Sequence, residues 1–326
     1  VLPTLFLHNV NTGLVTIGYD AGGTSNYSWY RVGGMTFQPA ELAKISFVLT
    51  LALHLNHVRG RVNKPANLLA LAVHVLLPVL AIHIQGDDGT ALVFFVAFLC
   101  IAFLRTGDLA SIVMMTAAAG FAGGLVLHFK PYVAQRFTVW RHAWEFTQTT
   151  GYQQSRTMSA AASGGLFGTG PEDAWLKYVG AANTDLVFGV VSEEFGLLLA
   201  LVCVGAVMAL AVFALRSGDS ARSGFYAIAA CAAASMLIFQ TTLNVLGAVD
   251  ILPLTGVTFP FVSMGGSSML SCWGLLAYLK AADVRLPPEE KPPEDKPEKP
   301  ARKREGFFED MPEIPVDEIF GKVGRS

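Results

Sequence analysis

Three acidic residues stand at the start of a long apolar run, where a carboxylate has an unusual environment. Asp185, Glu193 and Glu194 precede or lie within an otherwise uncharged stretch that continues to Leu215. An acidic side chain within a membrane-length helix costs roughly 2.5 to 3.5 kcal/mol on insertion scales, so such residues are rare and usually functional. We therefore expect these carboxylates to serve a site at a membrane edge.

Asp185 is the strongest candidate for a general base. It falls at the very start of the apolar run, where a polar substrate can still reach it from water. The simpler alternative is an acid favoured by the helix dipole, with Thr184 as the cap. Glu193 and Glu194 lie roughly 12 to 14 Å deeper at about 1.5 Å rise per residue, so a supporting role suits them better.

The elements that must position these residues are membrane-length helices. The sequence is 52% hydrophobic and only 15% charged, which indicates an all-α polytopic membrane protein. Apolar runs of about 20 residues each can cross a bilayer. Seven such spans are predicted, at 41–57, 67–85, 89–105, 109–128, 185–215, 224–248 and 260–281. Residues 2–18 are apolar but interrupted, and we interpret them as the remnant of an eighth span.

Basic residues between the spans predict the orientation. Arg59, Arg61 and Lys64 after the first span are taken as cytoplasmic, and every later short basic segment then falls on the same side. The chain accordingly divides into five parts. These are a partial N-terminal membrane segment with an outer loop (1–40), four transmembrane helices (41–128), a large extracytoplasmic loop (129–184), three transmembrane helices with a re-entrant outer loop (185–282), and a disordered cytoplasmic tail (283–326).

The loop at 129–184 carries more basic than acidic residues and several aromatic ones. We expect Arg136 and Arg156 to bind an anionic lipid headgroup, particularly a pyrophosphate, through charge-assisted hydrogen bonds. Ordinary anchoring of tryptophan and arginine at the membrane interface explains the same composition.

Two glycine-rich stretches, at 163–171 and 253–268, cannot easily continue a regular helix. Non-helical chain at membrane depth survives only where protein or a wet cavity surrounds it, which predicts a re-entrant segment at 253–268. Ser267 and Ser268 can contribute to a phosphate-binding nest if they open a helix. Close helix packing through small residues is the alternative.

Glu41 and Lys44 are spaced to pair on one helix face at the outer turn of the first span. The pair either holds a cavity in shape or is a simple interfacial ion pair, and Lys44 can alternatively pair with a deeper acid. A divalent cation, Mg²⁺ or Mn²⁺, bridged by Asp185 is a further hypothesis, although no acidic cluster with ligand spacing is evident.

Six strings occur in a fixed order and carry a family resemblance. They are Phe37–Lys44, Gly89–Phe94, Gly164–Gly170, Asn183–Phe188, Ser192–Gly196 and Pro253–Ser268. With them the chain resembles the SEDS family (shape, elongation, division and sporulation proteins), the RodA and FtsW type of peptidoglycan glycosyltransferase. The resemblance implies a SEDS-type helical bundle of ten membrane helices. It also implies that the first two or three of these are absent or degraded here.

The resemblance also implies an activity and partners. The family polymerises lipid II on the outer face of the bacterial cytoplasmic membrane, beside a class B penicillin-binding protein and other elongation or division complex proteins. Nucleic acid is not an expected partner. The family's essential aspartate falls on Asp185, its Gln-Pro-Ser-Glu-Leu-Ala-Lys helix on Glu41 and Lys44, and its Pro-Asp-Leu-Gly-Thr break on Asp87. The chain departs from the pattern at Gly86, which replaces a proline, at Asp88, which replaces a leucine, and at Ser25–Trp29, which replaces Gly-Ala-Arg-Arg-Trp.

Glycan extension from a lipid pyrophosphate needs a base for the attacking sugar hydroxyl and cations for the departing pyrophosphate. Asp185 and the basic loop fit those two needs. A flippase or transporter of lipid-linked precursors would also use intramembrane acids and broken helices. A non-catalytic scaffold for a cell-wall synthesis partner is the third reading.

Overall fold

The computed structural model describes residues 2–19, 27–58, 65–106, 131–219, 221 and 223–283, with isolated positions between 113 and 128. The span predicted at 109–128 lies mostly outside the described residues, and the predicted tail beyond Asp283 lies wholly outside them. The departure at Ser25–Trp29 is described only from Tyr27 onward.

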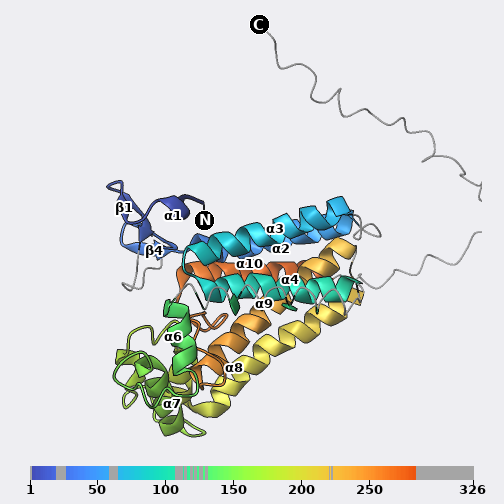
Figure 1. Cartoon of the computed structure of the whole chain (residues 1–326). Helices are drawn as coiled ribbons and strands as arrows, with labels where there is room; N and C mark the ends of the chain where they lie inside the picture. Colours follow the sequence, from blue (N-terminus) through green and yellow to red (C-terminus); the bar gives the residue numbers. More distant parts are fainter. Residues whose placement is uncertain are drawn as a thin grey trace, which may run out of the picture. The chain divides into compact units, whose positions relative to one another are not determined.

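Within the described residues, six long helices form a bundle. They are α2 (Pro39–His57), α3 (Pro65–Ile84), α4 (Asp88–Thr106), α8 (Val187–Asp219), α9 (Gly224–Ala248) and α10 (Gly266–Ala282). Helix α9 packs against α8, α10, α4 and α2 (Figure 1). Its buried face is rich in alanine, including Ala229, Ala230, Ala232 and Ala233, which are fully buried. These small side chains let neighbouring backbones approach closely.

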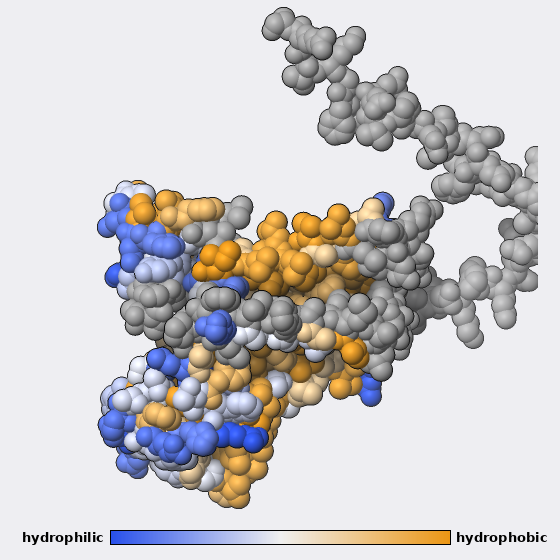
Figure 2. All heavy atoms as spheres, viewed as in Figure 1, coloured by the Kyte–Doolittle hydropathy of each residue, from blue (hydrophilic) through white to orange (hydrophobic). Residues whose placement is uncertain are grey.

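The outward surfaces of the bundle are apolar. On α3, Leu69 and Ile84 are 67% and 63% exposed, and on α8 Val202 is 64% exposed. Figure 2 shows hydrophobic residues along the helices and hydrophilic residues gathered over the loops at one end. Two helical stretches of the described chain, Val187–Ser217 and Gly224–Ala248, are long and apolar enough to cross a membrane, and Leu69–Ile84 and Asp88–Leu104 are shorter apolar helices. Exposed apolar surface on this scale is typical of contact with lipid or with another chain.

One end of the bundle, here called the loop end, gathers the elements that concern the site. Helices α2, α4, α8 and α10 begin there, and α3 and α9 end there. The short helices α6 (Pro131–Val139), α7 (Tyr152–Gly164) and η1 (Leu176–Tyr178) lie in the connection that leads to α8. Between α9 and α10 the chain has no regular structure from residue 249 to 265, where the glycine-rich sequence predicted a non-helical segment.

Helix α8 is kinked at Gly196, whose backbone angles (φ 87°, ψ 163°) are not helical. The amides that the kink frees are bound by the glycine-rich loop after α7: Leu197 N donates to the oxygen of Gly165 at 2.9 Å. In return Thr169 N donates to the oxygen of Glu193 at 2.8 Å. A Cβ atom at Gly196 would lie 2.2 Å from the oxygen of Leu166, so only glycine allows this close approach.

The N-terminal region differs from its sequence prediction. Residues 2–18 do not form the remnant of a membrane span but a short helix, α1 (Leu2–Phe6), and two strands, β1 (Val10–Asn11) and β2 (Val15–Tyr19). The two strands join β3 (Trp29–Val32) and β4 (Met35–Phe37) in an antiparallel sheet with the order β1-β2-β3-β4. Asn9 (φ 53°) and Gly13 (φ 90°) adopt left-handed backbone angles that end a helix and favour turns.

Candidate functional site

Asp185 lies in the turn that leads into α8, outside the helix itself, and its side chain is partly buried. Burial raises the pKa of its carboxyl from 3.8 to about 6, and the nearby charge of Asp87 also acts to raise it. The Thr184 hydroxyl and the Arg136 guanidinium act in the opposite direction. A carboxylate with a pKa near 6 is still largely ionised at neutral pH and is a stronger base than an ordinary aspartate.

Arg136 on α6 reaches the same region. Its Nη1 donates a 3.2 Å hydrogen bond to the oxygen of Thr255, in the segment between α9 and α10. The next residue, Gly256, faces Asp185 so closely that a Cβ atom there would lie 3.3 Å from Oδ2. The structure therefore brings together the predicted base and one of the two predicted cations.

Arg156 on α7 is in a different place. Its guanidinium stacks on the ring of Tyr152, 5.3 Å from the ring centroid. It lines a surface cavity of about 230 Å³ together with Trp144, Thr147, Gln148, Ser155 and Ser159. The lining includes neither Asp185 nor Arg136, so the structure does not join the two predicted arginines in one site.

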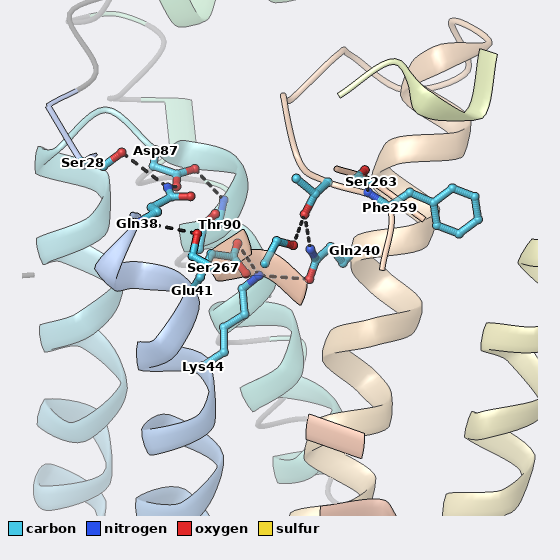
Figure 3. A network of polar contacts seen from close by, with 12 residues as sticks. Ser28, Gln38, Glu41, Lys44, Asp87, Thr90, Gln240, Phe259, Ser263 and Ser267 are labelled. Carbon is cyan, nitrogen blue, oxygen red and sulfur yellow. Dashed lines mark hydrogen bonds and ion pairs between the residues drawn. The ribbon is translucent and has the colours of Figure 1, made fainter. Parts of the chain in front are cut away.

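Asp87 sits at the turn between α3 and α4 in a network of polar side chains (Figure 3). Its Oδ2 accepts a 2.6 Å hydrogen bond from Nε2 of Gln38, and its Oδ1 accepts the amide of Thr90 at 3.0 Å. Burial raises the pKa of the Asp87 carboxyl, and the Thr90 hydrogen bonds partly offset that rise. Gln38 also donates to the buried hydroxyl of Ser28 at 3.4 Å, which ties the end of the sheet region to the bundle.

Glu41 and Lys44 form a buried ion pair on α2. Nζ of Lys44 lies 2.8 Å from Oε1 of Glu41, and the Lys44 and Glu41 side chains are 1% and 5% exposed. Lys44 also donates to Oε1 of Gln240 on α9 at 3.1 Å. The acid that pairs with Lys44 is thus Glu41 of the same helix and not a deeper one, and Gln240 links the pair to α9.

The network continues to α10. Nε2 of Gln240 donates to Thr258 at 2.9 Å, and the Thr258 hydroxyl lies 2.7 Å from that of Ser268. The hydroxyl of Ser267 accepts the amide of Gln38 at 3.4 Å. Both serines are 5% exposed. Their hydroxyls therefore pair within the protein, and their binding of a phosphate stays a prediction.

Glu193 is buried on α8 and faces the connection before it. Its two carboxylate oxygens accept the amides of Trp175 and Leu176, each at 3.0 Å. The carboxylate thus holds the start of η1, and any effect of Glu193 on Asp185 is indirect. Glu194 is only partly buried, and its backbone oxygen accepts the amide of Gly170 at 3.1 Å.

Several residues of this region had no role assigned from sequence, among them Gln38, Gln240, Asn244, Thr258 and Ser263. A signal was available for two of them, because Gln240 and Asn244 are polar residues one helical turn apart inside the apolar run at 224–248. Among the described residues, no group of three or more His, Cys, Asp or Glu side chains can hold a metal ion. Asp87 and Asp185 interact electrostatically, but the described residues offer the predicted divalent cation no fuller set of acidic ligands.

Comparison with known proteins identifies the family. A family model for FtsW, RodA and SpoVE, described as cell cycle protein, matches residues 2–286. The chain belongs to the FtsW, RodA and SpoVE family. The SEDS resemblance is thereby confirmed, and so is the expectation of a helical, polytopic membrane protein, with the small N-terminal sheet as an addition.

Individual family members show how far the similarity extends. The chain is 32% identical over 283 residues to the probable peptidoglycan glycosyltransferase FtsW of Tolumonas auensis, covering 83% of this chain and 71% of that protein. It is 30% identical over 264 residues to the peptidoglycan glycosyltransferase RodA of Mycobacterium leprae, covering 77% of this chain and 57% of that protein. The chain thus spans between half and three quarters of these family members.

Two solved structures share the fold of this chain. The rod shape-determining protein RodA of Thermus thermophilus matches with a TM-score of 0.55 and 25% identity, over 82% of this chain and 71% of that chain. A chain from a peptidoglycan synthase complex that coordinates polymerization and crosslinking matches with a TM-score of 0.66 and 24% identity, over 81% of this chain and 74% of that chain. These likenesses place the helix bundle within the family's architecture.

Proposed function

We propose that this chain is a peptidoglycan glycosyltransferase that polymerises lipid II, with Asp185 as the general base. The observation that carries the proposal is the environment of Asp185, a partly buried carboxylate at the loop end whose pKa is raised to about 6. Family membership supports the same reading, because its relatives are named peptidoglycan glycosyltransferases.

The reaction follows from these groups. Asp185 removes the proton from the attacking sugar 4-hydroxyl as the oxygen forms a bond to C1 of the donor sugar. The bond from C1 to the pyrophosphate oxygen breaks, and its electron pair leaves with the lipid pyrophosphate. Arg136, whose charge acts on Asp185, provides positive charge for that leaving group. Arg156 lines a separate surface cavity, so we place it outside the reacting centre.

Asp87, Glu41 and Lys44 support the site from the bundle side. The Asp87 charge raises the pKa of Asp185, while the buried Glu41 and Lys44 pair ties α2 to α9 through Gln240. A divalent cation would add positive charge beside the pyrophosphate. Since the acidic side chains of the described residues form no group of three or more, we assign no step to a metal ion.

The membrane setting completes the proposal. We place the loop end on the extracytoplasmic face of the bacterial cytoplasmic membrane, with residues 283–326 as a cytoplasmic tail. The basic segments between predicted spans support this orientation. A class B penicillin-binding protein is the proposed partner, since one related chain belongs to a complex for polymerization and crosslinking.

The test is polymerisation of purified lipid II, with and without a class B partner, on a gel that resolves glycan chains. We expect chains from the wild type in at least one setting and none from Asp185→Ala. Asp173→Asn is the matched control, because Asp173 is an exposed aspartate in the same connection. Equal product from wild type and Asp185→Ala would move catalysis elsewhere. No product from any protein in either setting would favour the flippase and scaffold readings.

A further inference from the structure

Three consecutive backbone oxygens in the turn that carries Asp185 accept hydrogen bonds from α9 and from the segment between α9 and α10. We call this set of hydrogen bonds the strap. The oxygen of Asn183 accepts the amide of Met264 at 2.8 Å. The oxygen of Thr184 accepts the hydroxyl of Ser263 at 2.6 Å, and that of Asp185 accepts Nδ2 of Asn244 at 2.8 Å. Two of these three donors are side chains, so the strap depends on residue type and not on backbone geometry alone.

Asn244 makes a second bond that extends the strap. Its Nδ2 also donates to the oxygen of Val257 at 2.8 Å, so both amide hydrogens are used on backbone oxygens. The side chain is 2% exposed, and its Oδ1 has no hydrogen-bond partner. The orientation of the amide is therefore fixed, since the reverse placement would set Oδ1 against two carbonyl oxygens.

The segment held by this second bond contains the other parts of the site. Val257 follows Gly256, whose missing side chain leaves room for Oδ2 of Asp185. Thr255 precedes Gly256, and its backbone oxygen accepts a 3.2 Å hydrogen bond from the guanidinium of Arg136. The buried side-chain amide of Asn244 thus links Asp185, the proposed base, to the segment that binds Arg136.

Ser263 is the second side chain that holds this turn, through the oxygen of Thr184. Its side chain is 3% exposed, and its hydroxyl donates to the oxygen of Thr184 and accepts the amide of Phe259 at 2.8 Å. Phe259 is itself buried, at 1% exposure, so the hydroxyl links the turn before α8 to a fixed point of the core.

We infer that Asn244 and Ser263 are positioning residues, which hold the Asp185 carboxylate in register with Gly256 and with the segment that binds Arg136. The inference rests on the proposed function. Displacement of a reacting group by about 1 Å can cost roughly 100-fold in rate, so loss of a positioning residue affects turnover more than substrate binding.

The experiment measures kcat and KM for lipid II from pH 5 to pH 8 in purified wild type, Asn244→Ala, Ser263→Ala and Asp185→Asn. Thr242→Val is the matched control, because Thr242 lies on the same helix and its hydroxyl bonds to the oxygen of Ile238 in that helix.

For Asn244→Ala we expect kcat to fall roughly tenfold or more, with KM within about twofold of wild type. The acid limb of its pH profile should move to lower pH, because a released carboxylate gains water. Ser263→Ala should change both quantities in the same directions by less, and Thr242→Val should match wild type.

The outcomes separate this inference from the proposed function. Full activity of Asp185→Asn would overturn the proposed function. An inactive Asp185→Asn together with an Asn244→Ala protein that matches Thr242→Val in kcat and pH profile would overturn the positioning role alone. If Asn244→Ala does not yield folded protein, Ser263→Ala decides: a wild-type kcat and pH profile would overturn the inference.

Discussion

Gly256 lies directly against the carboxylate of Asp185. A Cβ atom at Gly256 would meet Oδ2 at 3.3 Å, and the backbone there has a φ of 72°, which side chains rarely adopt. Glycine at this position therefore serves two purposes: it permits the turn and it leaves space for the proposed base.

Gly256→Ala is expected to lower polymerisation by roughly tenfold or more, because the new methyl group displaces the Asp185 carboxylate. Gly170→Ala is the control, since Gly170 has a φ of 88° but a Cβ atom there would meet nothing within 4 Å. Both variants carry similar backbone strain, so their difference in kcat reports the contact with Asp185. Equal kcat values for the two would show that this contact does not matter.

Glu41→Ala should destabilise the protein by roughly 3 to 5 kcal/mol, because it leaves the Lys44 ammonium buried without its carboxylate. Thermal unfolding in detergent measures the effect. A double variant, Glu41→Leu with Lys44→Met, removes both charges and should recover much of the loss. A melting temperature of Glu41→Ala equal to that of the wild type would show that this ion pair does not stabilise the fold.

Glu193→Ala should lower the free energy of unfolding by about 1 to 3 kcal/mol, because two backbone amides lose their acceptor. Glu194→Ala changes the neighbouring, partly buried glutamate and should have a smaller effect. Limited proteolysis of the connection before α8 gives a second readout, since η1 should become cleavable only in Glu193→Ala. Equal melting curves and equal proteolysis of the two variants would contradict the assignment.

Asp185→Asn should stabilise the folded protein at neutral and higher pH. The folded-state pKa of Asp185 lies above its ordinary value, so the ionised carboxylate costs folding free energy above pH 6. The expected gain is about 1 to 2 kcal/mol at pH 8, since a pKa unit corresponds to about 1.4 kcal/mol and the side chain keeps some contact with water. The gain should shrink as pH falls from 6 toward 4. A melting temperature difference that is independent of pH would contradict the raised pKa.

Sequence patterns predicted the helical part of the fold because apolar runs of membrane length leave little choice of structure. The runs at 41–57 and 224–248 fall on α2 (Pro39–His57) and α9 (Gly224–Ala248). The N-terminal sheet was not predicted, because residues 2–18 are apolar enough to resemble part of a span. The paired glycines Gly33 and Gly34, both with positive φ, were the available signal for a hairpin.

The sequence drew attention to some residues of the candidate site, and their roles stay predictions. The acid at the start of α8 stood out because charge is rare beside an apolar run, but Arg136 and Arg156 could not be told apart by composition. Only the placement of α6 beside the segment after α9 separates them, through the bond from Arg136 to Thr255. Asn244 stands out in the sequence only as a polar residue in an apolar run. Its contacts are with backbone oxygens of residues outside its own helix, so the sequence does not show which groups it binds.

The most direct test of the central claim is the pH dependence of lipid II polymerisation by wild type and Asp185→Asn. If Asp185 is the general base, wild-type kcat/KM should fall below a pH of about 6 and the Asn variant should be inactive at every pH. Asp173→Asn should follow the wild-type curve. A wild-type rate that stays constant from pH 5 to pH 8, or substantial polymerisation by Asp185→Asn, would contradict the account.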